Sequence, residues 1–579
     1  MSKNNKADLN RRQILKGSIA GALLVGGGAA LPRVGAKESD IKWDSVTDVI
    51  CVGSGAAACS AAVTATNLGN KVTLIEKAPI FGGTTRRSGG VAWIPNNFSL
   101  KAAGIEDSEV DCIRYMARYA YPERYNAAIP TLGLDELEFQ KLQALYRNAS
   151  PAVDMLNELG IGNFIRFDLP GDRGPSPDYA YALEENKVPH GRSLWPDPKV
   201  DGGRGAALVD HSIAWLESKG ATLLTEHRVQ GLIMDNGRVV GAEVEHAGKV
   251  LRIRARKGVI FGSGGFAHNK ELCHAYQPPV YGSCAAPTAT GDFVKIASAV
   301  GACMGDLSSA WRTQVVLEEA LQSPVMGRAL NIPPGDAMIL VNKYGRRVVN
   351  EKRNYNDRTR VHFEWDATNA EYPNQLLYML FDQRAIDVYG GAYPFPQDVR
   401  ENPYLISGNT IEELATNLQA RLDSLKYKIG QVKLSERFAA EASATIKRFS
   451  EFARKGEDPD FNRGSQGEIA WLGYFSLPRK GQEHMLKDMA NLTLYPFTEK
   501  GPYYALIVAP GALDTNAGPK INANAQVLDA HGKPIPGLYG AGNCVASPSH
   551  NAYFGAGGTV GPALTFGYIA AQSIHKIGA

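Results

Sequence analysis

Residues 48–58 read DVICVGSGAAA. Five mostly apolar residues of a short buried strand run directly into a G-x-G-x-x-A turn, and small residues then continue as a helix. A second apolar strand at 71–75 ends at Glu76. Strand, turn, helix, strand and acid in this order predict a βαβ unit that binds a dinucleotide. Gly53 permits the tight turn, Gly55 lets a pyrophosphate approach the backbone, and Glu76 is placed to bind ribose hydroxyls.

Glycine-rich turns recur far along the chain from this unit. They occur at 82–85 (GGTT), 88–90 (SGG), 262–265 (GSGG), 289–292 (ATGD), 540–543 (GAGN) and 555–562 (GAGGTVGP). Turns of small residues let a backbone pass close to a flat ring. They therefore favour a flavin over a nicotinamide nucleotide, and non-covalent FAD is the predicted cofactor.

The turns lie towards both ends of the chain, and the segment between them has a different character. It has fewer glycine turns and more amphipathic stretches, such as Ile411–Leu425 with leucines at helical spacing. We therefore predict an α/β fold in which a discontinuous, Rossmann-like FAD-binding domain at 46–315 and 512–579 carries an inserted α+β domain. This substrate-binding or capping domain is predicted at 316–511.

Composition excludes several other classes of protein. The chain has 579 residues, more than one hydrophobic core usually serves. Its net charge of +3 gives no basic excess for binding nucleic acid. The seven cysteines contain no CxxC pair, which excludes a zinc ribbon, a ferredoxin-type cluster and an attached c-type haem. No metal site is predicted, and beyond the N-terminal segment no apolar run is long enough to span a membrane.

The N-terminal segment, 1–36, has the pattern of an export signal. Residues 10–16 (NRRQILK) form a charged region, an apolar stretch of about 15 residues follows, and 34–36 (VGA) suit cleavage. The stretch is shorter than the roughly 20 residues of a spanning helix. The paired arginines resemble a twin-arginine signal, which exports proteins after folding. We expect cleavage near Ala36 and a periplasmic or otherwise exported location.

Two further motifs join the turns. They are NKYGRRVVNE at 342–351 and YFGAGGTVGPALTFGY at 553–568. Together these segments resemble the flavoprotein superfamily of fumarate reductase and succinate dehydrogenase, and within it the branch of 3-ketosteroid Δ1-dehydrogenases and related cyclic-ketone dehydrogenases. The resemblance implies an FAD-dependent oxidoreductase that acts on a CH–CH group beside a ketone. A tyrosine base takes the α-proton and the flavin N5 accepts the β-hydride.

The resemblance also assigns roles to residues of this chain. Tyr553 and the backbone N–H of Gly557 hold the carbonyl oxygen, and Tyr355 is the base. Tyr179 supports that base, with Tyr181 as an alternative. The expected cofactor contacts are Gly53, Gly55, Ala57, Ala58, Glu76, Lys77, Gly83, Thr84, Thr85, Ser88, Gly89, Gly90, Val229, Gly264, Gly265, Asp292, Gly542, Asn543, Gly558, Val560 and Gly561.

These residue types suit that chemistry. An α C–H bond is a very weak acid, so its removal needs donors that stabilise the developing enolate oxygen, each worth about 3–4 kcal/mol. A free tyrosine has a pKa of about 10, so a tyrosine base needs a partner that favours its phenolate. An apolar, aromatic cavity favours a small cyclic ketone, either a steroid or an alicyclic one. The sequence does not indicate which external acceptor reoxidises the flavin.

Two other functions remain open from the sequence. An exported ene reductase similar to fumarate reductase would run the reaction backwards. Such enzymes bind carboxylates through a histidine and an arginine, but the corresponding segments here read DTNAG at 514–518 and AYFGAGG at 552–558. A dicarboxylate is therefore disfavoured, whereas reduction of an enone is not. A non-catalytic flavin carrier is disfavoured because both oxyanion and base candidates are present.

Overall fold

The computed structural model describes residues 41–170, 173–487 and 489–576. The described residues all belong to one compact unit. The predicted export signal at 1–36 lies outside them. Within the described ranges, no helix has both the length and the apolar content needed to cross a bilayer. Nor do three or more His, Cys, Asp or Glu side chains in that part of the chain gather as they would around a metal ion.

The largest sheet has eight strands, in the order β15-β16-β9-β1-β2-β6, with β8 paired to β9 and β7 to β8. Its central strand, β1, is parallel to both neighbours, so that Ile50 lies opposite Thr73 and Val259. An apolar run such as that of β1 is typical of a strand buried on both faces. The strands are β1 (Ser45–Val52), β2 (Val72–Ile75), β6 (Thr222–Leu224), β7 (Arg228–Asp235), β8 (Arg238–His246), β9 (Lys249–Phe261), β15 (Gln526–Leu528) and β16 (Pro534–Gly540).

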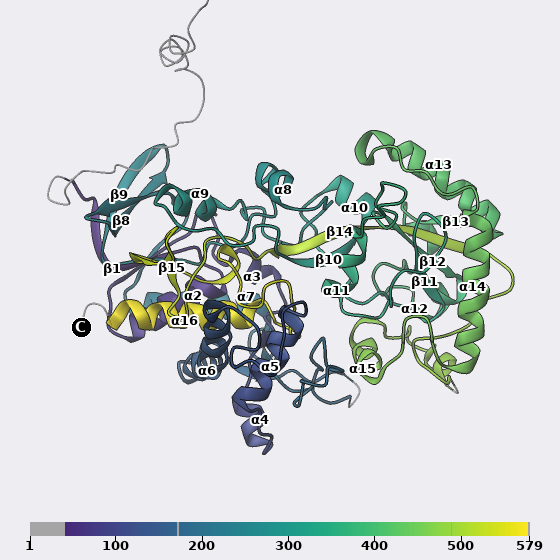
Figure 1. Ribbon diagram of the computed structural model, residues 1–579, viewed down its shortest axis with the longest axis horizontal. Coiled ribbons are helices and arrows are strands. Elements are labelled where there is room, and N and C mark those ends of the chain that lie inside the picture. Colours follow the sequence, from purple (N-terminus) through teal and green to yellow (C-terminus); the bar gives the residue numbers. More distant parts are fainter. Residues whose placement is uncertain (1–40, 171–172, 488, 577–579) are drawn as a thin grey trace, which may run out of the picture. The chain divides into compact units, whose positions relative to one another are not determined.

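Helices α2 and α16 pack against each other although they come from opposite ends of the chain (Figure 1). The Ser60 hydroxyl of α2 donates to the Leu564 carbonyl of α16 (2.7 Å). Contact is this close because Gly567 has no side chain: a Cβ there would lie 2.3 Å from the Ala57 carbonyl oxygen. The helices associated with this part of the chain are α2 (Ala56–Asn67), α3 (Gly83–Arg87), α4 (Phe98–Ala102), α5 (Glu109–Ala120), α6 (Glu136–Glu158), α7 (Arg204–Ser218), α8 (Lys270–Tyr276), α9 (Asp292–Ala299) and α16 (Val560–Lys576).

A second, five-stranded sheet has the order β10-β14-β12-β11, with β13 paired to β14, and its pairs are antiparallel. Its strands are β10 (Ala310–Val316), β11 (Met338–Val341), β12 (Leu377–Asp382), β13 (Ile406–Gly408) and β14 (Tyr503–Thr515). Its helices are α10 (Leu317–Gln322), α11 (Tyr355–Thr359), α12 (Gln383–Tyr389), α13 (Ile411–Ile429), α14 (Phe438–Lys455) and α15 (Gln466–Phe475). Strands β10 and β14 extend beyond the predicted limits of the inserted domain, 316–511.

A third, small sheet pairs β5 with β3 and β4. These strands are β3 (Ala92–Trp93), β4 (Phe164–Arg166) and β5 (Ser193–Pro196). Short 3-10 helices occur at Arg360–Phe363, Val399–Glu401, Glu483–Leu486 and Gly542–Cys544.

A buried ion cluster fixes the segment that precedes Tyr179. The guanidinium of Arg192, which is fully buried, binds both carboxylate oxygens of Asp107 (2.9 and 2.7 Å) and one of Asp178. Asp178 also accepts the indole N–H of Trp93 (2.8 Å). Because Asp178 is the neighbour of Tyr179 in sequence, the cluster holds that tyrosine in place.

Removal of the central guanidinium leaves buried carboxylates without their counter-charge. We expect Arg192→Ala to lower the free energy of unfolding by about 3–5 kcal/mol in denaturant titrations. Arg346→Gln is the matched control, because Arg346 is exposed and pairs with Glu441 at the surface (3.2 Å). That change should cost at most about 1 kcal/mol. Equal losses in the two variants would contradict a special role for the buried cluster.

Candidate functional site

A cleft of about 990 Å³ lies at the carboxyl ends of the central parallel strands. Val52, Ile75 and Phe261, the last residues of β1, β2 and β9, all line it. Ligands of open α/β sheets bind at this edge of the sheet. The position of the cleft therefore suits a cofactor.

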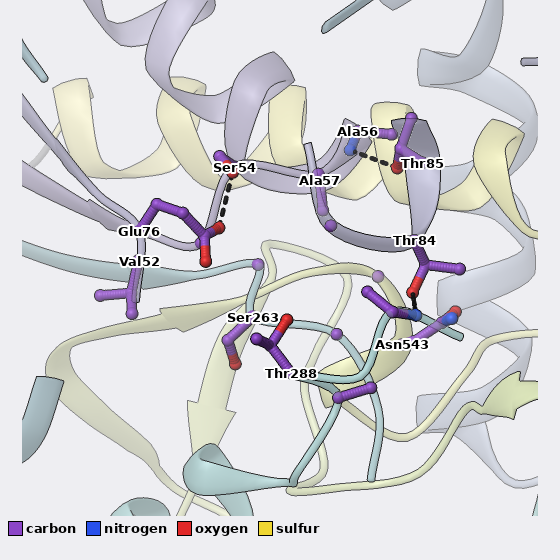
Figure 2. A pocket seen from close by; sticks show the side chains of 18 of the residues that line it. Val52, Ser54, Ala56, Ala57, Glu76, Thr84, Thr85, Ser263, Thr288 and Asn543 are labelled. Carbon is purple, nitrogen blue, oxygen red and sulfur yellow. Dashed lines mark hydrogen bonds between the residues drawn. The ribbon is translucent and has the colours of Figure 1, made fainter. Parts of the chain in front are cut away.

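The start of α2 faces this cleft and is free to bind an anion. The first turn of α2 contains no acidic residue, and Gly55 offers no side-chain cap. The Ala56 N–H donates to the Thr85 hydroxyl (2.9 Å), as Figure 2 shows. At Gly53 φ is +97°, and a Cβ there would lie 2.6 Å from the Gly262 carbonyl oxygen. The turn thus requires glycine, and the helix dipole favours a phosphate charge beside it.

Glu76 lies buried in the wall of the cleft. Its carboxylate accepts the Ser54 hydroxyl (2.6 Å; Figure 2) and the Ala78 N–H (2.8 Å). Ser54 in turn accepts the Gly82 N–H (2.7 Å), so one hydroxyl joins three segments of the wall. The remaining lone pairs of Glu76 can accept hydroxyl groups of a ribose.

Charged side chains meet at another part of the cleft. Asp292 binds Lys77 (2.9 Å) and Arg228 (2.9 Å), and these ion pairs keep the pKa of Asp292 below its usual value despite burial, which raises it. The sequence analysis missed Arg228 because it lies on a strand without a recognisable motif. Next to it, His227 stacks on His246 with ring centres 3.9 Å apart.

Most of the predicted cofactor residues meet in this cleft. Those that line it are Gly53, Gly55, Ala57, Glu76, Lys77, Gly83, Thr84, Thr85, Ser88, Val229, Gly264, Asp292, Gly542, Asn543 and Val560. Gly89 and Gly90 line an adjoining chamber instead.

Four other predicted contacts do not line the cleft, namely Ala58, Gly265, Gly558 and Gly561. Ala58 packs against Gly262, and a Cβ on Gly265 would collide with Thr515. A Cβ on Gly558 would meet the Tyr553 ring, and one on Gly561 would meet the backbone of Trp93. These positions need a small residue because protein atoms lie against them.

The adjoining chamber has a volume of about 1660 Å³ and shares a wall with the cleft. Both are lined by Thr84, Ser88, Asp514, Asn543, Thr559 and Val560. Large rings dominate the rest of the chamber, namely Phe167, Tyr179, Trp311, Tyr355, Tyr393, Trp471, Phe475 and Tyr553. The chamber is therefore a largely aromatic space next to the cofactor cleft.

The four predicted catalytic residues all line this chamber. The Tyr179 hydroxyl donates to the Tyr355 hydroxyl (3.1 Å), and the Tyr553 ring stacks on Tyr179 with centres 5.3 Å apart. The Tyr553 and Tyr355 rings meet edge to face, also at 5.3 Å. No hydrogen bond within the described residues uses the Gly557 N–H. Tyr181 instead donates to the Ser465 hydroxyl and does not line the chamber.

Burial dominates the electrostatics of the three phenols. It raises the pKa of Tyr355 well above its usual value, and the negative charge of an ionised Tyr179 or Tyr553 would raise it further. Burial likewise raises the pKa of Tyr179 and of Tyr553, while a hydrogen bond with Tyr355 opposes the shift in each. All three are therefore neutral at pH 7 in the free protein, and forming a phenolate costs free energy.

Asp514 is a buried acid at the junction of cleft and chamber that the sequence analysis did not select. Burial raises its pKa to about 6, although the Asn543 amide and the Gly265 N–H bind it (3.2 and 3.1 Å). Asn543 also accepts the indole N–H of Trp311 (3.0 Å), whose ring meets Tyr553. This network joins the cofactor cleft to the phenol cluster.

Comparison with known proteins identifies the family of the chain. Residues 48–560 match the FAD binding domain family, and the chain belongs to that family. It is an FAD-dependent oxidoreductase. Its sequence is 31% identical to "4-oxocyclohexanecarboxylate 2-dehydrogenase" of Sinomonas cyclohexanicum, over 92% of this chain and 93% of that protein. It is 30% identical to "3-oxosteroid 1-dehydrogenase" of Mycobacterium tuberculosis, over 91% of this chain and 98% of that protein.

A solved structure has the same fold. It is 3-ketosteroid delta1-dehydrogenase from Sterolibacterium denitrificans in complex with 1,4-androstadiene-3,17-dione. The TM-score is 0.75 at 25% identity, and the match covers 92% of this chain and all of that one.

The turn at Gly53 provides a test of the FAD site. In Gly53→Ala the new Cβ must displace the Gly262 carbonyl, so we expect FAD affinity to fall at least about tenfold, measured as FAD content and Kd after purification. Gly69→Ala is the control: φ there is also positive (+82°), but a Cβ would meet nothing within 4 Å. FAD retention in Gly53→Ala would contradict the assigned position of the pyrophosphate.

Proposed function

We propose that this protein introduces a double bond next to the carbonyl group of a cyclic ketone. One observation carries the proposal: the buried Tyr179–Tyr355 pair, the Tyr553 ring and the unused Gly557 N–H all line an aromatic chamber that shares a wall with the FAD cleft. Donors for a carbonyl oxygen and a candidate base thus border one apolar space. Bound FAD supplies the two-electron oxidant for the C–H bond at the β-carbon.

The residues of the chain have distinct roles in this proposal. The Tyr553 hydroxyl and the Gly557 N–H donate to the ketone oxygen, so negative charge that develops there is stabilised. The Tyr355 oxygen takes the proton from the α-carbon. The Tyr179 hydroxyl donates to Tyr355 and so favours its ionised form. The aromatic rings exclude water, which strengthens each of these interactions.

The substrate proposed is an alicyclic or steroid ketone, because the relatives are named for 4-oxocyclohexanecarboxylate and 3-oxosteroids. The chamber adds one distinction. Two exposed arginines, Arg87 and Arg328, line it and form no ion pair within the described residues. An anionic group on the ring would find a partner there, which favours a ketone that carries a carboxylate.

The direct test is reduction of the bound flavin by candidate ketones under nitrogen. We expect loss of visible flavin absorbance with 4-oxocyclohexanecarboxylate or a 3-oxosteroid, and formation of the corresponding enone. The methyl ester of 4-oxocyclohexanecarboxylate has no anionic group, so it should bind more weakly than the acid if Arg87 and Arg328 bind the carboxylate. Oxidation of a reduced flavin by enones, with no reduction by any saturated ketone, would favour the reverse reaction instead.

Tyr553→Phe should separate catalysis from cofactor binding. Loss of one donor to the carbonyl oxygen is expected to lower kcat by about 10²- to 10³-fold. FAD content should stay unchanged, because the Tyr553 hydroxyl lies in the chamber and its residue does not line the cofactor cleft. Tyr539→Phe is a suitable control, since Tyr539 is buried in β16 away from both cavities. Wild-type turnover in Tyr553→Phe would contradict the proposed role.

The base should give the reaction a characteristic pH dependence. Tyr355 acts in its ionised form, and burial raises its pKa, so the active fraction grows as pH rises. We expect kcat/KM to increase between pH 7 and 9, by up to about tenfold per unit. Tyr179→Phe removes the donor to Tyr355 and should move this rise to higher pH. A flat profile in the wild type would argue against a phenol base.

A further inference from the structure

A second, smaller cavity borders the same pair of tyrosines. It has a volume of about 370 Å³ and shares with the aromatic chamber Tyr179, Ile332, Tyr355, Trp471 and Phe475. The rest of its wall does not line the chamber and includes four charged side chains. It consists of Asp178, Tyr181, Lys352, Arg353, Asn354, Gly467 and Glu468. The Tyr179–Tyr355 pair therefore borders both the chamber and a second cavity that contains ionisable groups.

The proposed reaction needs a path by which a proton can leave Tyr355. Each turnover leaves a proton on Tyr355, which is 8% exposed and faces the chamber that the ketone fills. Its hydroxyl bonds to the Tyr179 hydroxyl (3.1 Å), and both residues line the second cavity. That cavity is narrow, with room for about one water molecule. A proton can thus leave the pair without entering the chamber.

Glu468 is the acid best placed to receive that proton. It lies on α15, one helical turn before Trp471, whose ring meets Tyr179 edge to face at 5.9 Å. Its carboxylate is buried and accepts two hydrogen bonds, from the Asn350 amide (2.9 Å) and the Gly464 N–H (2.8 Å). Lone pairs remain for water. Burial also raises its pKa, which makes protonation accessible.

The other charged groups around this cavity are less suited. Asp178 already accepts from Trp93, Asn186 and Arg192. Lys352 donates to the carbonyls of Pro333 and Gly335 and has no lone pair while charged.

Arg353 lines the cavity and is partly exposed. Its side chain is 32% exposed and pairs with Asp357 (3.5 Å), and its charge also acts on Glu468. Tyr181, in the same wall, donates to Ser465. The Arg353 side chain therefore connects the wall of the cavity with bulk water.

We propose that this second cavity is the exit path of the α-proton and that Glu468 relays the proton to solvent; the inference rests on the proposed function. The α C–H bond breaks and an O–H bond forms on Tyr355. That O–H bond then breaks as the proton passes, through the Tyr179 hydroxyl or cavity water, to a Glu468 oxygen and on to bulk water. No electrons travel along this path; the oxidant is FAD.

Exchange of the α-hydrogens of the ketone tests the path without net oxidation. Holoenzyme with its FAD reduced beforehand is incubated with ketone in D2O, and deuterium at the α-carbon is followed by NMR. Glu468→Gln cannot accept a proton, so we expect exchange about 10- to 100-fold slower, with unchanged FAD content and ketone Kd. The solvent isotope effect on turnover should rise. Glu468→Asp should recover most of the exchange rate.

Glu318→Gln is the matched control, because burial also raises the pKa of Glu318 but it lines neither cavity and pairs with Arg421. It should exchange at the wild-type rate. Wild-type exchange in Glu468→Gln would overturn this inference alone, as would a Glu468→Asp enzyme no faster than Glu468→Gln. Absence of α-exchange in the wild-type enzyme would overturn the proposed function and this inference with it.

Discussion

The structure depends on close backbone contacts that only residues without a side chain, or with a very small one, permit. Gly262 at the end of β9 lies against Ala58 of α2, where a Cβ would come within 2.5 Å of the Ala58 nitrogen. Gly567 of α16 approaches the Ala57 carbonyl in the same way. These contacts bring β9, α2 and α16 together. As a result the nucleotide-binding turn and the tail segment with Tyr553 and Gly557 border neighbouring cavities.

The chamber combines two properties that oppose each other. An apolar, aromatic enclosure suits a cyclic ketone and strengthens hydrogen bonds to its oxygen. The same enclosure raises the pKa of Tyr355 and so lowers the fraction of ionised base. The Tyr179 hydroxyl offsets part of this cost, because it donates to Tyr355. The second cavity beside the pair is the route that we propose for the proton.

The local parts of the fold were predictable from sequence, because each depends on residues close together in the chain. The apolar run of β1, the turn at Gly53 and the acid at the end of β2 indicate a βαβ unit directly. The tyrosines at 179, 355 and 553 came from a family resemblance, and their roles stay predictions although the structure gathers them. Their spacing in sequence carries no signal of contact.

Residues selected by tertiary packing alone were not predictable. Asp514 reaches the junction of cleft and chamber through the end of β14, and Glu468, on α15, reaches the wall of the cavity beside the tyrosine pair. Neither lies in a motif. Conversely, Gly265, Gly558 and Gly561 lie in glycine-rich turns that line the cofactor cleft in part, but their own neighbours are protein atoms. A motif locates a turn, whereas the packing around it decides which of its residues meet a ligand.

Strand β14 has a consequence for cofactor loading. Its 13 residues run through the second sheet, pairing with β10, β12 and β13, and end at Thr515. There the Thr515 hydroxyl accepts the Phe266 N–H (2.7 Å) beside the cleft. One continuous strand thus runs through the second sheet and ends at the wall of the cofactor cleft. The second sheet and the wall against which FAD is loaded therefore depend on the same strand.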